Sequence, residues 1–183
     1  GHDWGAVVGW HLAAHHPDRV GSLTAVSVPH PAAYSWAVQH DADQRARSAY
    51  ITLLRMEGKA ESTLLDDSAR RLRAMYAPVP APDAVDHYVA VLGEPGAMTA
   101  ALNWYRALDR DFRDLPAVKV PTTYLWSTAD VAIGRAGAER CHEFAEGDYE
   151  FVVLDEVSHW IPEENPDAVA AANQRFTYMG TDK

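Results

Sequence analysis

The chain has 183 residues, of which 48% are hydrophobic and 23% charged, and its formal net charge is −10. This composition is typical of a globular protein and excludes collagen-like, coiled-coil and disordered chains. The excess of acidic residues argues against binding to nucleic acid or to anionic lipid, so neither nucleic acid nor a membrane is expected as a partner. The lone cysteine, Cys141, rules out an intrachain disulfide and fits a reducing compartment, which predicts a cytoplasmic protein.

Three apolar, β-rich runs predict strands, and none of them alternates cleanly with polar residues. Such runs are typical of a parallel sheet whose strands are buried on both faces. The predicted strands are Arg19–Val28, Pro121–Trp126 and Glu150–Leu154. Helices are predicted over Gly5–His16, Arg135–Ala145 and Glu163–Phe176. Strands that alternate with helices in this way indicate an α/β layer fold.

The long stretch between the first two predicted strands carries no strand signal. Turn signals divide it into three predicted helices: Ala42–Met56, Ala84–Leu92 and Ala97–Leu108. A connection of this length exceeds an ordinary crossover loop, so we interpret it as a helical insertion. The predicted domains are a catalytic core over residues 1–31, a helical cap or lid over 32–116, and the C-terminal part of the core over 117–183.

The opening residues Gly1-His2-Asp3-Trp4-Gly5 lead directly into a helical pattern. Glycines two positions before and after a central polar residue are typical of a sharp strand-to-helix turn, where a Cβ at either glycine is expected to clash. Such an elbow lifts Asp3 to the carboxyl end of its strand. The helix N-terminus behind Asp3 offers backbone N–H groups, first that of Trp4, to a developing oxyanion. The alternative is an ordinary turn in which Asp3 caps the helix.

The choice of aspartate at the elbow selects a chemistry. A carboxylate that attacks a saturated carbon gives an ester, and water can hydrolyse the carbonyl of that ester. A serine attacking the same carbon would give an ether, which cannot be released in this way. Asp3 therefore predicts epoxide opening or halide displacement.

Two further polar residues follow predicted strands. Asp130 comes after the second strand, in Trp126-Ser127-Thr128-Ala129-Asp130, and His159 follows the third, in Ser158-His159-Trp160. Taken singly, such residues are more often turn or packing residues. Nucleophile, acid and histidine nevertheless stand in the chain order of the α/β-hydrolase triad.

On these motifs the chain resembles the C-terminal part of α/β-hydrolases of the epoxide hydrolase family. The resemblance also covers Val28-Pro29-His30-Pro31 and Leu102-Asn103-Trp104-Tyr105-Arg106. It implies a mostly parallel sheet flanked by helices, with a helical cap. In that family the tyrosine of the motif that contains Tyr105 binds the epoxide oxygen. Tyr50 stands where the family has a second cap tyrosine. Phenols suit the task, because they can protonate the oxygen as its charge develops. The alternative is that both are core aromatics.

The resemblance implies a two-step reaction on a small-molecule epoxide and water, with no cofactor and no metal. Asp3 attacks the epoxide while Tyr50 and Tyr105 stabilise its oxygen. His159, supported by Asp130, then activates water against the ester, and the Trp4 N–H holds the oxyanion. The family's N-terminal strands and its His-Gly-x-Pro loop do not occur in this sequence. We therefore expect the chain to be a fragment, insoluble or inactive alone, and the sequence does not assign the second oxyanion donor.

Two competing functions remain open at this point. A haloalkane dehalogenase shares the Asp–His–acid set, and Trp4 would suit a halide ligand, but that family does not use the tyrosine pair. The second competing function is that of a binding module: a truncated, catalytically inactive protein with the hydrolase fold. The complete polar set argues against it. The identity of the epoxide, the regiochemistry and enantiopreference, and the oligomeric state cannot be read from the sequence.

Overall fold

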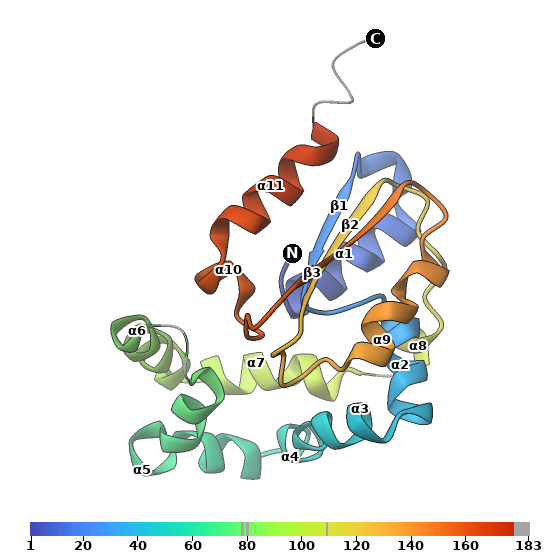
Figure 1. The fold of residues 1–183 in the computed structure, drawn as a ribbon. Coiled ribbons are helices and arrows are strands. Elements are labelled where there is room, and N and C mark those ends of the chain that lie inside the picture. The colour runs from blue at the N-terminus through green and yellow to red at the C-terminus, as the bar shows by residue number, and fades with distance from the viewer. Residues whose placement is uncertain (78, 80, 109, 178–183) are drawn as a thin grey trace. The chain divides into compact units, whose positions relative to one another are not determined.

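The computed structural model describes residues 1–77, 79, 81–108 and 110–177 (Figure 1). The chain divides into two compact units. The larger comprises Gly1–Arg47 and Arg110–Lys183, and the smaller comprises Ser48–Asp109.

The larger unit contains a parallel sheet of three strands in the order β1-β2-β3 (Figure 1). These are β1 (Leu23–Val26), β2 (Thr122–Ser127) and β3 (Tyr149–Leu154). All three predicted strands are therefore confirmed. The first is shorter than predicted at both ends: Arg19 belongs to a 3₁₀ turn, η1 (Pro17–Arg19), that Pro17 opens, and Ser27 leaves extended geometry with φ 67°.

Helices cover both faces of this sheet, as the alternation of its side chains requires. Ala25, Tyr124 and Trp126 pack into one cluster with residues of α1 (Trp4–His15). Val26 and Leu125 point to the other face, into a cluster with residues of α10 (Ile161–Glu164) and α11 (Pro166–Thr177). The result is a three-layer α/β/α arrangement, which confirms the predicted fold class.

Three elements depart from the expected pattern. The predicted helix over Glu163–Phe176 is divided into α10 and α11, because Asn165 leaves helical geometry and Pro166 opens a new helix. Strand β3 is only partly buried, and Val153 is 40% exposed. It pairs with β2 alone among the described strands. The predicted helix over Arg135–Ala145 is observed as α9 (Arg135–Arg140) followed by η2 (Cys141–Phe144).

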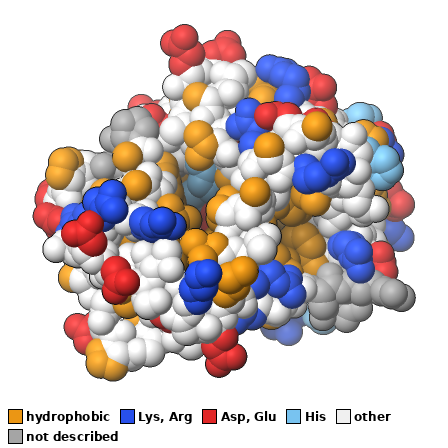
Figure 2. Space-filling view, turned by 90° about the horizontal axis from the view of Figure 1, so that it is seen from below, with side chains coloured by type: hydrophobic (Ala, Val, Ile, Leu, Met, Phe, Trp, Pro, Cys, Tyr) orange, Lys and Arg blue, Asp and Glu red, His pale blue; other side chains and the backbone are white. Residues whose placement is uncertain are grey.

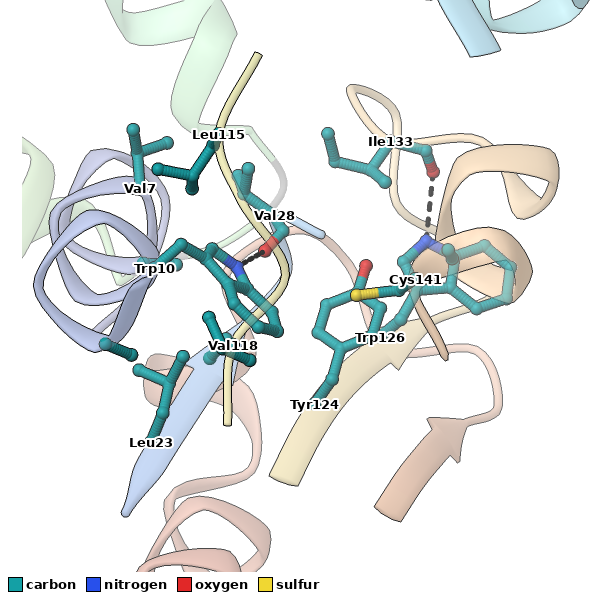
Figure 3. Close-up of a cluster of buried hydrophobic side chains, with 14 of the residues drawn as sticks. Val7, Trp10, Leu23, Val28, Leu115, Val118, Tyr124, Trp126, Ile133 and Cys141 are labelled. Atoms are coloured by element: carbon teal, nitrogen blue, oxygen red, sulfur yellow. Dashed lines mark hydrogen bonds between the residues drawn. The ribbon is translucent and has the colours of Figure 1, made fainter. Parts of the chain in front are cut away.

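The main core fixes the backbone beyond two strands as well as packing the sheet. Trp10 and Trp126 are buried, and their indole N–H groups donate to the carbonyls of Val28 at 3.1 Å and Ile133 at 3.0 Å (Figure 3). Val28 follows β1, and Ile133 lies in the segment that follows β2. The core therefore holds the backbone beyond the carboxyl ends of both strands.

The predicted insertion over 32–116 is longer at both ends than the smaller compact unit. Helices α2 (Pro31–His40), α3 (Ala42–Arg47) and α8 (Arg110–Arg113) belong to the larger unit. The reason is local packing: α2 contacts α9, and Gln44 of α3 is fully buried and hydrogen-bonded to residues 132 and 134.

The smaller unit is helical. It contains α4 (Tyr50–Leu54), α5 (Lys59–Tyr76), α6 (Pro82–Gly93) and α7 (Ala97–Arg106). Helices α2 and α5 were not predicted. Charged residues fill α5 and leave it few apolar side chains, and non-helical backbone at Asp66–Ala69 kinks it. Part of the predicted bend at 76–82 lies outside the described residues.

The surface carries charged side chains of both signs. On the face drawn in Figure 2, Lys and Arg side chains stand among acidic and apolar ones. In the described part of the chain, no helix combines the length and the apolar character needed to cross a membrane.

Candidate active site

The predicted elbow is present at Asp3. Its backbone has φ 50° and ψ −120°, a conformation that non-glycine residues rarely adopt and that costs of order 1–3 kcal/mol. Pairing with β1 holds it there: Val26 N–H donates to the Gly1 carbonyl at 2.9 Å, and Asp3 N–H donates to the Val26 carbonyl at 3.3 Å. Helix α1 begins at the next residue, Trp4. The Asp3 side chain makes no capping hydrogen bond, so the alternative of an ordinary helix cap is wrong.

The two flanking glycines differ in the space that a Cβ atom would have. A Cβ on Gly1 would lie 2.2 Å from the backbone oxygen of Gly5, a clash that no rotamer can relieve. A Cβ on Gly5 would meet nothing within 4 Å. The expectation of a clash at Gly5 is therefore wrong: Gly5 already lies in the first turn of α1, and its Cβ direction is open.

The three residues predicted for the triad come together in the larger unit. His159 Nε2 lies 3.4 Å from Asp3 Oδ1, and His159 Nδ1 lies 2.9 Å from Asp130 Oδ2. Asp130 follows β2 and His159 follows β3. Because parallel strands end at the same edge of a sheet, these loops meet above the elbow. This arrangement can support a nucleophile, a base and a group that orients the base.

Asp130 is held rigidly for an orienting role. Its side chain is fully buried, and Oδ1 accepts hydrogen bonds from the N–H groups of Ala132 at 2.8 Å and Ile133 at 2.9 Å. The other oxygen is then left to His159. Both oxygens have partners, as a buried carboxylate requires.

Two residues of α3 support the Asp130 loop and were not found from the sequence. Arg47 donates to the backbone carbonyl of Asp130. Gln44 donates to the Ala132 carbonyl at 2.8 Å and accepts from Gly134 N–H at 2.8 Å. In sequence, α3 has the composition of a solvated helix, so no local signal identifies these contacts.

Electrostatics in the site favour an ion pair in the resting state. Burial opposes the charge on His159, but the hydrogen bonds and charges of Asp130 and Asp3 raise its pKa to about 10. Burial also opposes the charge on Asp3 and would by itself raise the pKa of that carboxyl group. The hydrogen bond and charge of His159 and the backbone N–H of Trp4 outweigh burial and lower it. The imidazolium therefore lies between two carboxylates, and the Trp4 N–H reaches the Asp3 carboxyl group. The role of Trp4 as oxyanion donor stays a prediction.

The two predicted tyrosines come together within the smaller unit. Tyr50 opens α4 and Tyr105 lies on α7. Their ring centroids are 6.4 Å apart, with an interplanar angle of 75°. The neighbouring Arg106 pairs with Glu61 of α5 at 2.8 Å, with both side chains mostly buried, and this ties the Tyr105 turn of α7 to α5.

Within the described ranges, no three His, Cys, Asp or Glu side chains are grouped as ligands of a metal ion would be.

Comparisons with known proteins agree with this geometry. The profile of the Alpha/beta hydrolase family matches residues 1–172. Among curated proteins, the chain is 31% identical over 173 residues to "AB hydrolase superfamily protein YfhM" of Bacillus subtilis, covering 91% of this chain and 60% of that protein. It is 31% identical over 216 residues to "Epoxide hydrolase A" of Mycobacterium tuberculosis, covering 96% of this chain and 67% of that protein. The chain thus spans about two thirds or less of these relatives.

Solved structures give the same family. Epoxide Hydrolase A from Mycobacterium thermoresistibile is 30% identical with a TM-score of 0.75, covering 97% of this chain and 68% of that one. An inhibitor complex of Bacillus megaterium epoxide hydrolase has a TM-score of 0.82 at 22% identity, covering 96% of this chain and 66% of that one. At that identity the second match supports the fold alone.

The elbow predicts opposite effects for the two glycines in the full-length protein. Gly1→Ala should lower the free energy of unfolding by about 1–3 kcal/mol, because the new Cβ meets backbone. Gly5→Ala should raise it by up to about 1 kcal/mol, because alanine replaces glycine in a helix with open space around it. Urea unfolding measures both. Equal losses in the two variants would contradict this description of the turn.

The resting ion pair predicts a pH-dependent contribution of His159 to stability. Its pKa is raised from the ordinary 6.5 to about 10, so the stabilisation is complete below pH 6.5 and is lost as pH rises through 10. The difference in unfolding free energy between the parent protein and His159→Gln should shrink over that window. Chemical denaturation at a series of pH values measures it, and a constant difference would show that the imidazole is not charged in the folded protein.

Proposed function

The chain belongs to the α/β hydrolase family, among hydrolases of the epoxide hydrolase type, and from this premise we propose that the full-length protein hydrolyses an epoxide to a vicinal diol through an ester on Asp3. One observation carries the proposal: the Asp3 carboxylate at a strained elbow lies 3.4 Å from an imidazole that is bound to the buried Asp130. The substrates in this proposal are a small-molecule epoxide and water.

In the first step, an oxygen of Asp3 attacks an epoxide carbon and forms an ester bond. The carbon–oxygen bond of the ring breaks, and its electron pair goes to the ring oxygen. The lowered pKa of Asp3 supports this role, because the carboxyl group is ionised, and its side chain is 39% exposed and so open to a reactant.

The phenols of Tyr50 and Tyr105 are assigned to the ring oxygen. An alkoxide is a strong base and leaves a neutral ring poorly, so hydrogen bonds and a proton from phenols lower the barrier as its charge develops. A departing halide needs no proton. The paired tyrosines of the smaller unit therefore favour an epoxide over a haloalkane as substrate.

In the second step, His159 acts as the base. Once Asp3 is an ester it carries no charge, so one of the two carboxylates that raise the His159 pKa is lost and the imidazole gives up its proton more readily. The neutral ring takes a proton from water as the water attacks the ester carbonyl, and returns it to the departing diol oxygen. Asp130 supports the imidazolium that forms, and the Trp4 N–H is assigned to the oxyanion.

A single turnover in heavy-oxygen water tests the covalent route. The first diol released should carry light oxygen taken from Asp3, because water attacks the ester carbonyl and leaves its own oxygen in the carboxylate. Mass spectrometry of the diol measures this. Heavy oxygen in the first diol would mean direct attack by water on the epoxide. Asp3→Ala should release no diol, and unchanged turnover would show that Asp3 is not the nucleophile. Absence of diol from the parent protein with any epoxide would favour the inactive-scaffold alternative.

The tyrosine assignment predicts a selective loss of the first step. Tyr50→Phe and Tyr105→Phe should each slow ester formation by about a hundredfold, since a general acid contributes at least that much. Rapid-quench measurement of the protein ester gives the rate. Tyr88→Phe is the matched control, because Tyr88 lies on α6 of the same unit and packs on Tyr76.

Substrate choice decides between the two ester-forming chemistries. Styrene oxide should turn over faster than a bromoalkane of similar size. If bromide release is faster and unaffected by the two tyrosine variants, the protein acts as a dehalogenase and the epoxide assignment is wrong.

A further inference from the structure

The loop that carries His159 is hydrogen-bonded at two consecutive carbonyl groups. Ser27, one residue beyond β1, donates from Oγ to the His159 carbonyl at 2.9 Å. Ser127, the last residue of β2, donates from Oγ to the Ser158 carbonyl at 2.9 Å. Both serines are fully buried. Two neighbouring strand ends therefore hold the backbone of the histidine loop directly, independently of the contacts of the imidazole.

His2 gives the same carbonyl a second partner. Its Nε2 lies 2.9 Å from the His159 carbonyl oxygen, and because a carbonyl can only accept, Nε2 carries the hydrogen. The His2 ring also packs against its neighbours, with centroids 5.0 Å from the His159 ring and 5.8 Å from that of Trp160. His2 directly precedes Asp3, so the elbow itself is linked to the backbone of the base.

The charge of His2 is compatible with this role. Burial and the positive charge of His159 lower its pKa, although the bond to the carbonyl and the charge of Asp3 partly oppose them. A neutral His2 beside a charged His159 keeps one N–H, and the carbonyl contact fixes that hydrogen on Nε2.

We infer that His2 is a positioning residue for the proposed base: together with Ser27 it fixes the His159 backbone, so that the imidazole stays between Asp3 and Asp130. The inference rests on the proposed function for its kinetic consequence. Loss of one donor leaves the buried carbonyl with the other. Loss of both leaves it unsatisfied, which is the costly case. The effect should fall mainly on hydrolysis of the ester, the step in which His159 must face a water molecule.

Two substitutions separate the hydrogen bond of His2 from its ring packing. His2→Phe keeps an aromatic ring and removes the donor, whereas His2→Gln keeps an amide N–H donor and removes the ring. In single turnovers we expect His2→Phe to slow ester hydrolysis about tenfold, with the ester on Asp3 accumulating in the protein mass spectrum. Ester formation should change by less than about twofold, and His2→Gln should restore hydrolysis.

The second donor supplies a stricter test. Ser27→Ala alone should slow hydrolysis modestly, and the double variant with His2→Phe should lose more than the product of the two single effects, because both donors serve one carbonyl. The matched control is Thr122→Val. It removes a buried hydroxyl that donates to the Val120 carbonyl at 3.0 Å, at the other end of β2 from Ser127. Hydrolysis should be unchanged in it.

A second readout needs no substrate. NMR titration of His159 should show its pKa, raised to about 10 in the parent, moving toward the ordinary value in His2→Phe and staying high in His2→Gln. If His2→Phe does not fold, His2→Leu removes the same donor and takes its place.

The outcomes distinguish the two proposals. If the parent forms and hydrolyses the ester, but His2→Phe matches it or His2→Gln is as slow as His2→Phe, the positioning role is wrong and the proposed function stands. If the parent forms no ester with any epoxide, the proposed function fails, and the titration alone decides the positioning role: an unchanged His159 pKa in His2→Phe overturns it.

Discussion

The contact of one imidazole with two carboxylates is the constraint around which the larger unit is built. His159 lies between Asp3 and Asp130; Asp130 is fully buried, His159 is nearly so, and Asp3 is partly exposed. Removing such charges from water is expensive unless each is paired and hydrogen-bonded. The site meets this condition with the N–H groups of Ala132 and Ile133 on one carboxylate and that of Trp4 on the other. The three groups are far apart in sequence, so only a fold that brings strand ends together can assemble them.

Buried core residues hold the loops beyond the strand ends in place. Trp10 and Trp126 each donate an indole N–H to a carbonyl beyond a strand end. Gln44 forms hydrogen bonds with a carbonyl and with an N–H of the Asp130 loop. Loops on a protein surface ordinarily move more than the elements they join. Here buried side chains hold the loop backbone at several points, so the distances within the site are set by core packing. A change at Trp126, which touches none of the reacting groups, would therefore reach Asp130 through residue 133.

The sequence was informative where chemistry and chain order coincide. Asp3 was predictable because glycines flank it at the start of a helical pattern. Asp130 and His159 were predictable because each follows an apolar strand-like run, and the order of the three residues matches a known triad. The supporting residues His2, Gln44 and Arg47 were not, since their partners lie at distant positions and nothing local marks them. Helix α5 was missed because charged residues dominate its composition and non-helical backbone at 66–69 interrupts it. The two glycines of the elbow look equivalent in sequence, and only the backbone path shows that a Cβ clashes at one and not at the other.

The electrostatics of the site bear on the order of the proposed steps. While Asp3 is ionised, the raised pKa keeps His159 protonated, and an imidazolium cannot take a proton from water. Water near the site is therefore not activated before the epoxide reacts. In the proposed reaction, formation of the ester removes the charge on Asp3 and, with it, one of the two interactions that hold the proton on His159. The same bond that captures the substrate thus lowers the pKa of the base that must release it. A neutral nucleophile such as serine carries no charge to lose, so an aspartate at the elbow does more than choose the carbon it attacks: it makes activation of the base depend on completion of the first step.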